Sequence, residues 1–189
     1  MRMVCAMLVL GVLWSHARAD LSAGAGKVQI CLTCHQPQHR LAAMPLLEGQ
    51  PAEYLYVQLK AYKDGTRADP TATMPSSAAN LTDRDMREIS SFLATQTVPG
   101  IAYQVDSDKA VRGRNKAMAL GCGNCHATDR NAPTAVPRLA GQAVGYSVAQ
   151  LQSFAGGTRA HGAGSQAAPA FSLTSADIEE LANHFAQSK

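Results

Sequence analysis

The chain has 189 residues, of which 46% are hydrophobic, 16% are charged and 5% are aromatic. This length allows one or two small domains, and the composition is that of a folded chain rather than a disordered one. The formal net charge of +3 argues against a basic surface large enough to bind nucleic acid. The five cysteines are the most informative residues.

Residues 1–19 have the pattern of an export signal. Arg2 precedes an apolar or glycine run from Val4 to Trp14, and Ala17-Arg18-Ala19 forms a small-x-small cleavage site. A membrane span needs roughly 20 apolar residues, so this run is too short to be an anchor. We therefore expect a periplasmic protein with a cleaved signal peptide. Loss of two arginines on cleavage lowers the net charge from +3 to +1.

The chain that follows is expected to be helical. The first expected helix covers residues 23–30, and the second runs from a proline at residue 51 to residue 63, with Gly65 just beyond its end. The third follows a predicted N-cap, Thr82, with Asp85 three residues later in a relative of the capping box. The same elements return at residues 109–120 and after Thr174. No segment alternates as a strand, so the predicted fold class is all-α.

The chain after the signal peptide consists of two copies of one sequence repeat. Between residues 45–68 and 137–160, 11 of 24 positions are identical in constant register, including the segment Gly-Thr-Arg-Ala at residues 65–68 and 157–160. A period of about 90 residues is too long for a solenoid unit. We therefore predict two tandem domains, residues 20–98 and 107–189, separated by a break at Pro99-Gly100.

Each repeat carries one Cys-x-x-Cys-His motif, which is typical of covalent haem attachment. The motifs are Cys31-Leu32-Thr33-Cys34-His35 and Cys122-Gly123-Asn124-Cys125-His126. The four cysteine thiols would add to haem vinyl groups, and His35 and His126 would be the proximal iron ligands. A zinc site would need two distant cysteine pairs to meet, and a thioredoxin-like dithiol would need a βαβ context. We therefore predict two covalently bound haem c groups.

The second iron ligand of the N-terminal haem is predicted to be Met74, in the loop 69–75. His39 is too close to His35 along the chain, and Met44 immediately precedes Pro45. Met86 lies on the apolar face of its expected helix, where a core position is the better interpretation.

The C-terminal repeat has Gln166 at the position of Met74, and no methionine follows Met118, which we expect in the core. Three possibilities stay open for this iron: His161 as a second histidine ligand, Gln166 as a weak amide ligand, or a site open to water or an external ligand. His184 is expected to be a packing or surface residue.

The repeated motifs and the segments Pro45–Gln50 and Pro137–Gln142 resemble those of the cytochrome c4 family, over residues 22 to 187. This resemblance implies two cytochrome c domains about a pseudo-twofold axis, with haem propionates meeting at the interface. It also implies that Pro45 and Pro137 orient the proximal histidines through their carbonyls. Family members have histidine and methionine ligands at both haems, which Met74 fits and Gln166 does not.

The expected function is periplasmic electron transfer between a quinol-oxidising complex or dehydrogenase and a terminal oxidase or reductase, without turnover by the protein itself. Peripheral association with the membrane is compatible with such partners. Arg67, Arg159, Tyr54 and Tyr146 are candidates to bind propionates, with interface packing as the alternative. The alternative function is a redox enzyme, or the haem subunit of one, whose second haem binds a small ligand.

Overall fold

The structure is a computed structural model, and it describes residues 21–36, 44–69, 71–126, 135–161 and 172–188. All regular elements in these ranges are helices, which confirms the all-α prediction. None of the helices in the described ranges has the length and apolarity that a membrane span requires. The predicted signal peptide lies outside the described residues.

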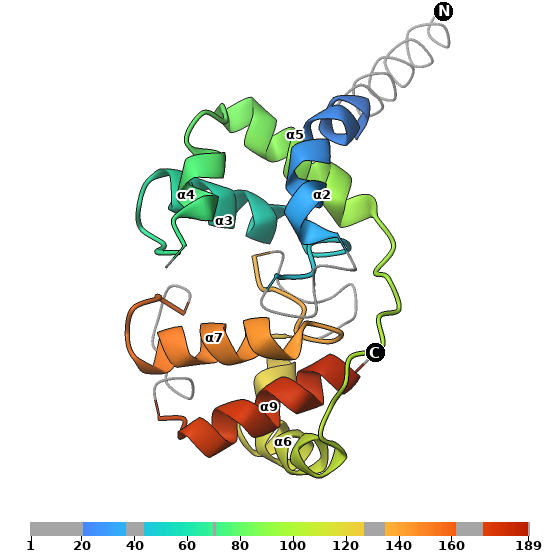
Figure 1. Ribbon diagram of the computed structural model, residues 1–189, viewed down its shortest axis with the longest axis vertical. Helices are drawn as coiled ribbons and strands as arrows, with labels where there is room; N and C mark the ends of the chain where they lie inside the picture. The colour runs from blue at the N-terminus through green and yellow to red at the C-terminus, as the bar shows by residue number, and fades with distance from the viewer. Residues whose placement is uncertain (1–20, 37–43, 70, 127–134, 162–171, 189) are drawn as a thin grey trace, which may run out of the picture.

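The N-terminal half contains a helical segment at residues 21–27 and four labelled helices (Figure 1). These are α2 (Gln29–His35), α3 (Ala52–Lys63), α4 (Thr73–Ala78) and α5 (Asp83–Thr95). Helix α3 begins directly after Pro51 and ends before Gly65, as predicted. Helix α5 begins with the predicted capping box, in which Thr82 and Asp85 each accept a hydrogen bond from the other's backbone N–H.

The C-terminal half repeats this order with α6 (Ser107–Ala119), the 3-10 helix η2 (Cys122–Asn124), α7 (Val144–Ala155) and α9 (Ser175–Gln187). Asp106 caps α6 by accepting a hydrogen bond of 3.0 Å from the backbone N–H of Lys109. Thr174 and Asp177 form a second capping box at the start of α9. The two predicted helix starts, Thr82 and Thr174, are therefore confirmed.

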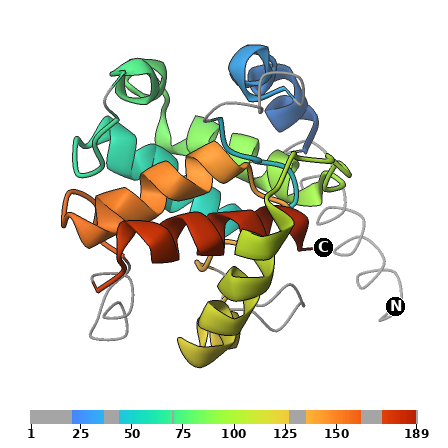
Figure 2. The same ribbon diagram turned by 60° about the horizontal axis from the view of Figure 1, so that its bottom comes forward.

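In each half the first helix crosses the last one at a glycine. A Cβ atom added at Gly113 of α6 would lie 1.9 Å from the carbonyl oxygen of Glu180 in α9. One added at Gly24 would lie 2.3 Å from the carbonyl oxygen of Glu88 in α5. Only a residue without a side chain allows this backbone contact. Figure 2 shows α6 crossing α9.

Each half has a small apolar core beside its cysteine motif. Val28, Leu55, Ile89 and Leu93 form the first core, and Cys31 packs against it. Ala117, Leu181 and Phe185 form the second, and Cys122 packs against it. The motif cysteines therefore border the core, where burial of a large apolar cofactor would extend it.

The two halves lie against each other with α3 and α7 at their interface (Figure 1). The chain passes from the end of α5 to α6 along one side, through residues 97–106, which form no regular element. The segments 45–50 and 137–142 also lie at this interface, because their backbones bond to glutamine side chains of the opposite half.

Candidate haem-binding sites

The first Cys-x-x-Cys-His motif lies on α2. Cys31 and Cys34 are three residues apart, so their side chains share one helix face, as attachment to a single porphyrin requires. Neither is in a disulfide; Cys31 is half-buried and Cys34 is exposed. Burial raises the pKa of the Cys31 thiol.

His35, the last residue of α2, is 5% exposed, and its Nδ1 lies 3.3 Å from the carbonyl oxygen of Pro45. A carbonyl only accepts hydrogen bonds, so Nδ1 carries the proton and donates it. The other ring nitrogen, Nε2, then keeps a lone pair for a metal ion. This contact places Pro45 in the orienting role that the family resemblance implied.

The second motif has a different local structure and the same proximal arrangement. Gly121 adopts a positive φ of 67° that ends α6 and starts η2 at Cys122. The Nδ1 of His126 donates to the carbonyl oxygen of Pro137 at 2.8 Å. Burial lowers the pKa of His126, which favours the neutral imidazole that metal binding needs.

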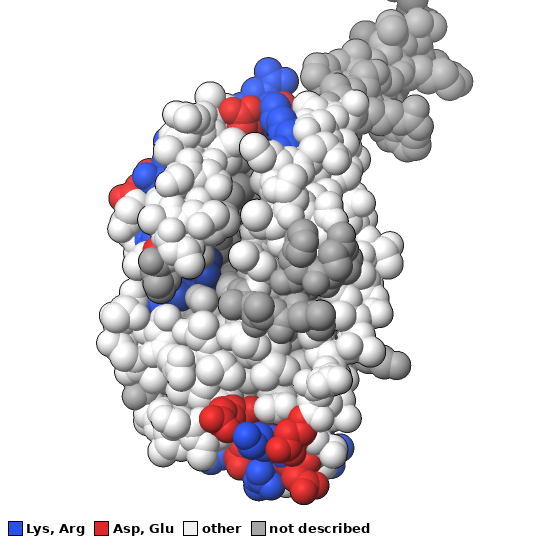
Figure 3. Space-filling view, viewed as in Figure 1, with Lys and Arg blue, Asp and Glu red and all other residues white. Residues whose placement is uncertain are grey.

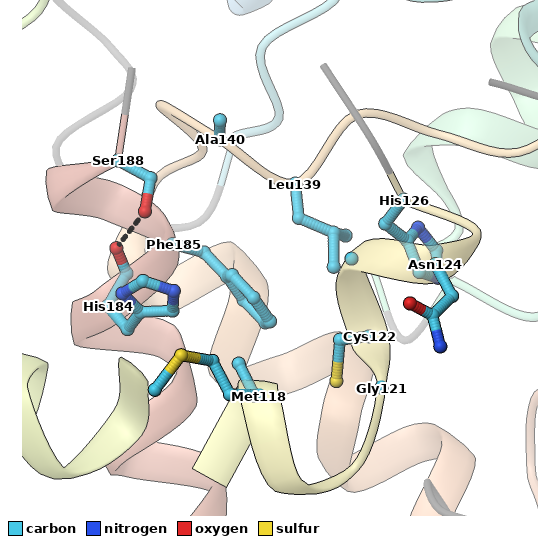
Figure 4. A pocket seen from close by; sticks show the side chains of 12 residues that line it. Met118, Gly121, Cys122, Asn124, His126, Leu139, Ala140, His184, Phe185 and Ser188 are labelled. Carbon is cyan, nitrogen blue, oxygen red and sulfur yellow. Dashed lines mark hydrogen bonds between the residues drawn. The ribbon is translucent and has the colours of Figure 1, made fainter. Parts of the chain in front are cut away.

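A cavity of about 380 Å³ lies beside this second motif (Figure 4). The cavity is lined by residues that include Cys122, His126, Leu139 and Phe185. In the view of Figure 4 the Cys122 side chain lies between those of Phe185 and His126. The volume of the cavity is in the range of sites for small organic ligands. The mix of apolar walls, a thiol and an imidazole suits a haem group.

Met74 lies in the first turn of the short helix α4, so its predicted placement in an irregular loop is wrong. The turn forms because the Asp69 carboxylate accepts hydrogen bonds from the Met74 backbone N–H at 3.0 Å and from the Thr71 hydroxyl at 2.8 Å. Short helices of this kind are hard to see in a sequence that contains proline and threonine. The Met74 side chain is half-buried, and its role as an iron ligand stays a prediction.

The other methionines divide between core and surface. Met86 is 3% exposed in α5, which confirms its predicted core position, whereas Met44 is 37% exposed. Met118 is 67% exposed, so its predicted core position is wrong. Helix α6 buries Ala110, Gly113 and Ala117. Met118 follows this stripe by one residue, so it lies outside the buried face of α6, and it lines the cavity beside the second motif with His184 and Phe185 of α9.

Of the candidate ligands of the second iron, His161 is described and Gln166 is not; His39 of the first repeat is also outside the described residues. The rings of His161 and His126 have centroids 5.9 Å apart. His184 is half-buried on α9 and packs over Gly113, which agrees with the packing role predicted for it.

The candidate propionate residues form a reciprocal hydrogen-bond network between the halves. Arg67 donates to the Tyr146 hydroxyl at 3.1 Å and to the Gln150 side-chain oxygen at 2.9 Å. Arg159 donates to the Tyr54 hydroxyl at 3.3 Å and to the Gln58 side-chain oxygen at 3.0 Å. The four residues named from the sequence therefore contribute to the interface.

Two further residues, Gln50 and Gln142, lie at the interface, and the sequence did not predict a role for them. Gln142 accepts a hydrogen bond from the Leu46 backbone N–H at 2.7 Å, and Gln50 accepts one from the Arg138 backbone N–H at 2.9 Å. Leu46 and Arg138 directly follow the prolines that bind the proximal histidines. The only sequence signal was that both copies have glutamine at this register.

Buried polar atoms support haem at the interface. Arg67 is 6% exposed, and its Nε atom is buried without a hydrogen-bond partner. A buried guanidinium with a free N–H suits a carboxylate, which a haem propionate supplies. With two proximal histidines and two cysteine pairs, this fit defines a c-type cytochrome with two haem sites.

Comparison with known proteins agrees with this class. A family model described as Cytochrome c matches residues 23–97. Cytochrome c4 of Azotobacter vinelandii is 32% identical over 174 residues, which cover 83% of each chain. The crystal structure of reduced cytochrome c4 from Pseudomonas stutzeri superposes with a TM-score of 0.74 at 26% identity, over 89% of this chain and 98% of that one. The thiosulfate dehydrogenase electron acceptor of Thiomonas intermedia is 28% identical over 176 residues, 84% of this chain and 78% of that protein.

The chain belongs to the cytochrome c4 family. It is accordingly a dihaem c-type cytochrome that carries electrons, with two covalently bound haem c groups. Cys31, Cys34 and His35 would hold the first haem, and the second motif would hold the other. Each haem supplies an iron that changes its charge by one electron, and the protein residues bind and orient it.

Proposed function

We propose that this protein transfers electrons in the periplasm, from a dehydrogenase or a quinol-oxidising complex to a terminal oxidase or reductase. The observation that carries the proposal is the reciprocal interface. Gln50 and Gln142 each bind the backbone beside the proline that orients the other half's proximal histidine. The two haem sites are thereby held in one unit, as electron passage between them requires.

A dehydrogenase is the donor class with the most direct support. A protein named a thiosulfate dehydrogenase electron acceptor matches 84% of the present chain. We extend this role to the present chain as a proposal: oxidation of a reduced sulfur compound by a separate dehydrogenase would deliver electrons to its haems.

The charge distribution suits brief encounters with redox partners. Figure 3 shows the face of the molecule seen in Figure 1. Charged side chains gather at its two ends, and its middle is largely uncharged apart from basic side chains near the interface. At one end, Lys109 pairs with Glu179 and Arg112 pairs with Glu180, so opposite charges balance locally. Such a surface steers partners weakly over long range, and association should depend little on salt.

One observation favours a second candidate, a haem enzyme or enzyme subunit whose second iron binds a small ligand. The C-terminal repeat has Gln166 where the first has Met74, and no methionine follows Met118. If no side chain replaces the methionine, that iron has a free coordination position.

The test is an electron-transfer assay with the purified dihaem protein. The oxidised protein is mixed with thiosulfate and a catalytic amount of thiosulfate dehydrogenase, and haem reduction is followed by absorption at low and high ionic strength. We expect both haems to be reduced, with less than about a threefold change in rate between the two salt conditions. Omission of the dehydrogenase is the control.

A protein that accepts no electrons from this dehydrogenase or from a quinol-oxidising complex, but turns over peroxide or nitric oxide by itself, would contradict the carrier proposal. Export is tested separately by the mass of the protein from the periplasmic fraction. We expect a chain that begins at Asp20 and carries two haems; an unprocessed chain in the cytoplasm would show the localisation to be wrong.

A further inference from the structure

Three of the positions at which the two repeats differ lie near the shared Gly-Thr-Arg segment and bear on the haem ligands. In the constant register, the N-terminal half has Tyr62, Asp69 and Met74, where the C-terminal half has Phe154, His161 and Gln166. Asp69 positions the backbone of Met74 through a hydrogen bond. The C-terminal half therefore lacks both the methionine and the carboxylate that places it, and has an imidazole in their region.

The distance between His161 and His126 fits two ligands of one metal ion. Their ring centroids are 5.9 Å apart, and the ring planes are inclined by 59°. A histidine nitrogen binds a transition metal at about 2 Å, so two imidazoles on opposite sides of one ion have ring centres about 6 Å apart. Because His126 is the histidine of the haem motif and its Nδ1 bonds to Pro137, its other nitrogen is available on the iron side.

The His161 ring is held by an aromatic neighbour. Phe154 of α7 contacts it edge to face, with centroids 4.8 Å apart and planes at 83°. The Arg159 guanidinium stacks over the Phe154 ring, 4.6 Å from the centre of the ring. Arg67 stacks in the same way over Tyr62 at 4.5 Å. Both halves thus have an aromatic ring at this position, and among the described residues a histidine contacts it in the second half.

We propose that His161 is the second axial ligand of the C-terminal haem, so that this iron has two histidine ligands while the N-terminal iron has His35 and Met74. The proposal rests on the proposed function only in requiring both haems to be attached. The His161 side chain is half-buried, as a residue at the edge of a cofactor site would be.

This ligation makes the two haems unequal. A methionine ligand raises the reduction potential relative to a second imidazole. The N-terminal haem then has the higher potential and is the preferred site for the first electron. With His126 and His161 both holding its iron, the C-terminal haem would give no access to an external ligand.

The test is a carbon monoxide titration of the reduced dihaem protein, together with electron paramagnetic resonance of the oxidised form. Wild-type protein is expected to bind no carbon monoxide and to give one bis-histidine signal and one histidine–methionine signal. The His161→Ala variant is expected to bind about one equivalent and to lose only the bis-histidine signal. Free imidazole should restore that signal, and His161→Met should convert it to a second histidine–methionine signal.

His184→Ala removes the other histidine of this half outside the haem motif, which lines the cavity beside that motif, and this variant should keep the bis-histidine signal. Binding of about one equivalent by wild-type protein, or an unchanged spectrum in His161→Ala, would overturn the proposal. If His161→Ala does not assemble with haem, the wild-type resonance spectrum decides, because the absence of a bis-histidine signal refutes the ligand. None of these readouts uses a redox partner, so the outcome is independent of the electron-transfer assay.

Discussion

Replacement of Gln142 by alanine should destabilise the holoprotein by about 2–4 kcal/mol, because it removes hydrogen bonds buried between the halves. Its side-chain oxygen accepts from the Leu46 backbone N–H at 2.7 Å, and its amide donates to the Leu46 carbonyl at 3.3 Å. Gln142 and Leu46 are 6% and 2% exposed. Water cannot easily replace these bonds, so the cost includes a buried N–H without an acceptor, about 1–3 kcal/mol by itself.

The assay is guanidinium chloride unfolding of the oxidised protein. With a slope of about 4 kcal/mol per molar denaturant, the midpoint should fall by roughly 0.5–1 M. Gln50→Ala, the equivalent change in the other half, should have a similar effect. Gln29→Ala is the control, because this exposed glutamine makes a local bond to the Ala25 carbonyl, four residues earlier, and lies away from the interface. A Gln142→Ala midpoint equal to that of Gln29→Ala would refute the reasoning that these bonds hold the halves together.

Two further predictions concern the C-terminal half. Gly113→Ala should cost more than about 2 kcal/mol, since the added Cβ would lie 1.9 Å from the Glu180 carbonyl oxygen and α6 would have to move from α9. Gly26→Ala, whose added Cβ would have no atom within 4 Å, is the control and should not lower the midpoint in the same unfolding assay. Asp177 has its pKa lowered to about 2 by hydrogen bonds from Lys116 and Thr174, against 3.8 for an ordinary aspartate. Its folded-state pKa is the lower one, so it contributes stability above about pH 4 that is lost as the pH falls toward 2. Unfolding midpoints measured across that range should therefore fall less steeply for Asp177→Asn than for wild type, and parallel curves would show that the carboxylate contributes nothing.

The helices and their starts could be predicted because local chemistry determines them. Thr82 and Thr174 cap their helices through residues three positions away, and the haem motifs are contiguous in sequence. The prediction for Met118 failed because the helix face that is buried depends on Gly113, where backbone contact replaces side-chain packing. Periodicity of apolar residues does not reveal a contact made by a glycine.

The cross-interface roles of Gln50 and Gln142 could not be read from the chain, because their partners are backbone groups nearly 90 or more residues away. Backbone groups have no sequence signal of their own. Likewise, the sequence left His161 as one of three ligand possibilities, and the proposal for His161 rests on the arrangement of His126, Phe154 and His161 in space.

The reciprocal contacts between the halves have the form of a twofold dimer interface. Arg67 bonds to Gln150, and Arg159, its equivalent in the other half, bonds to Gln58, the equivalent of Gln150. In a dimer of identical chains, any substitution at such an interface occurs twice. Here residues 97–106 join the halves covalently, so their association is intramolecular and each copy can change alone. Asp69 in one copy and His161 at the equivalent position of the other are an example. A substitution in one copy alone can make the two haem sites of a symmetric framework differ, and such a difference gives electron flow a direction.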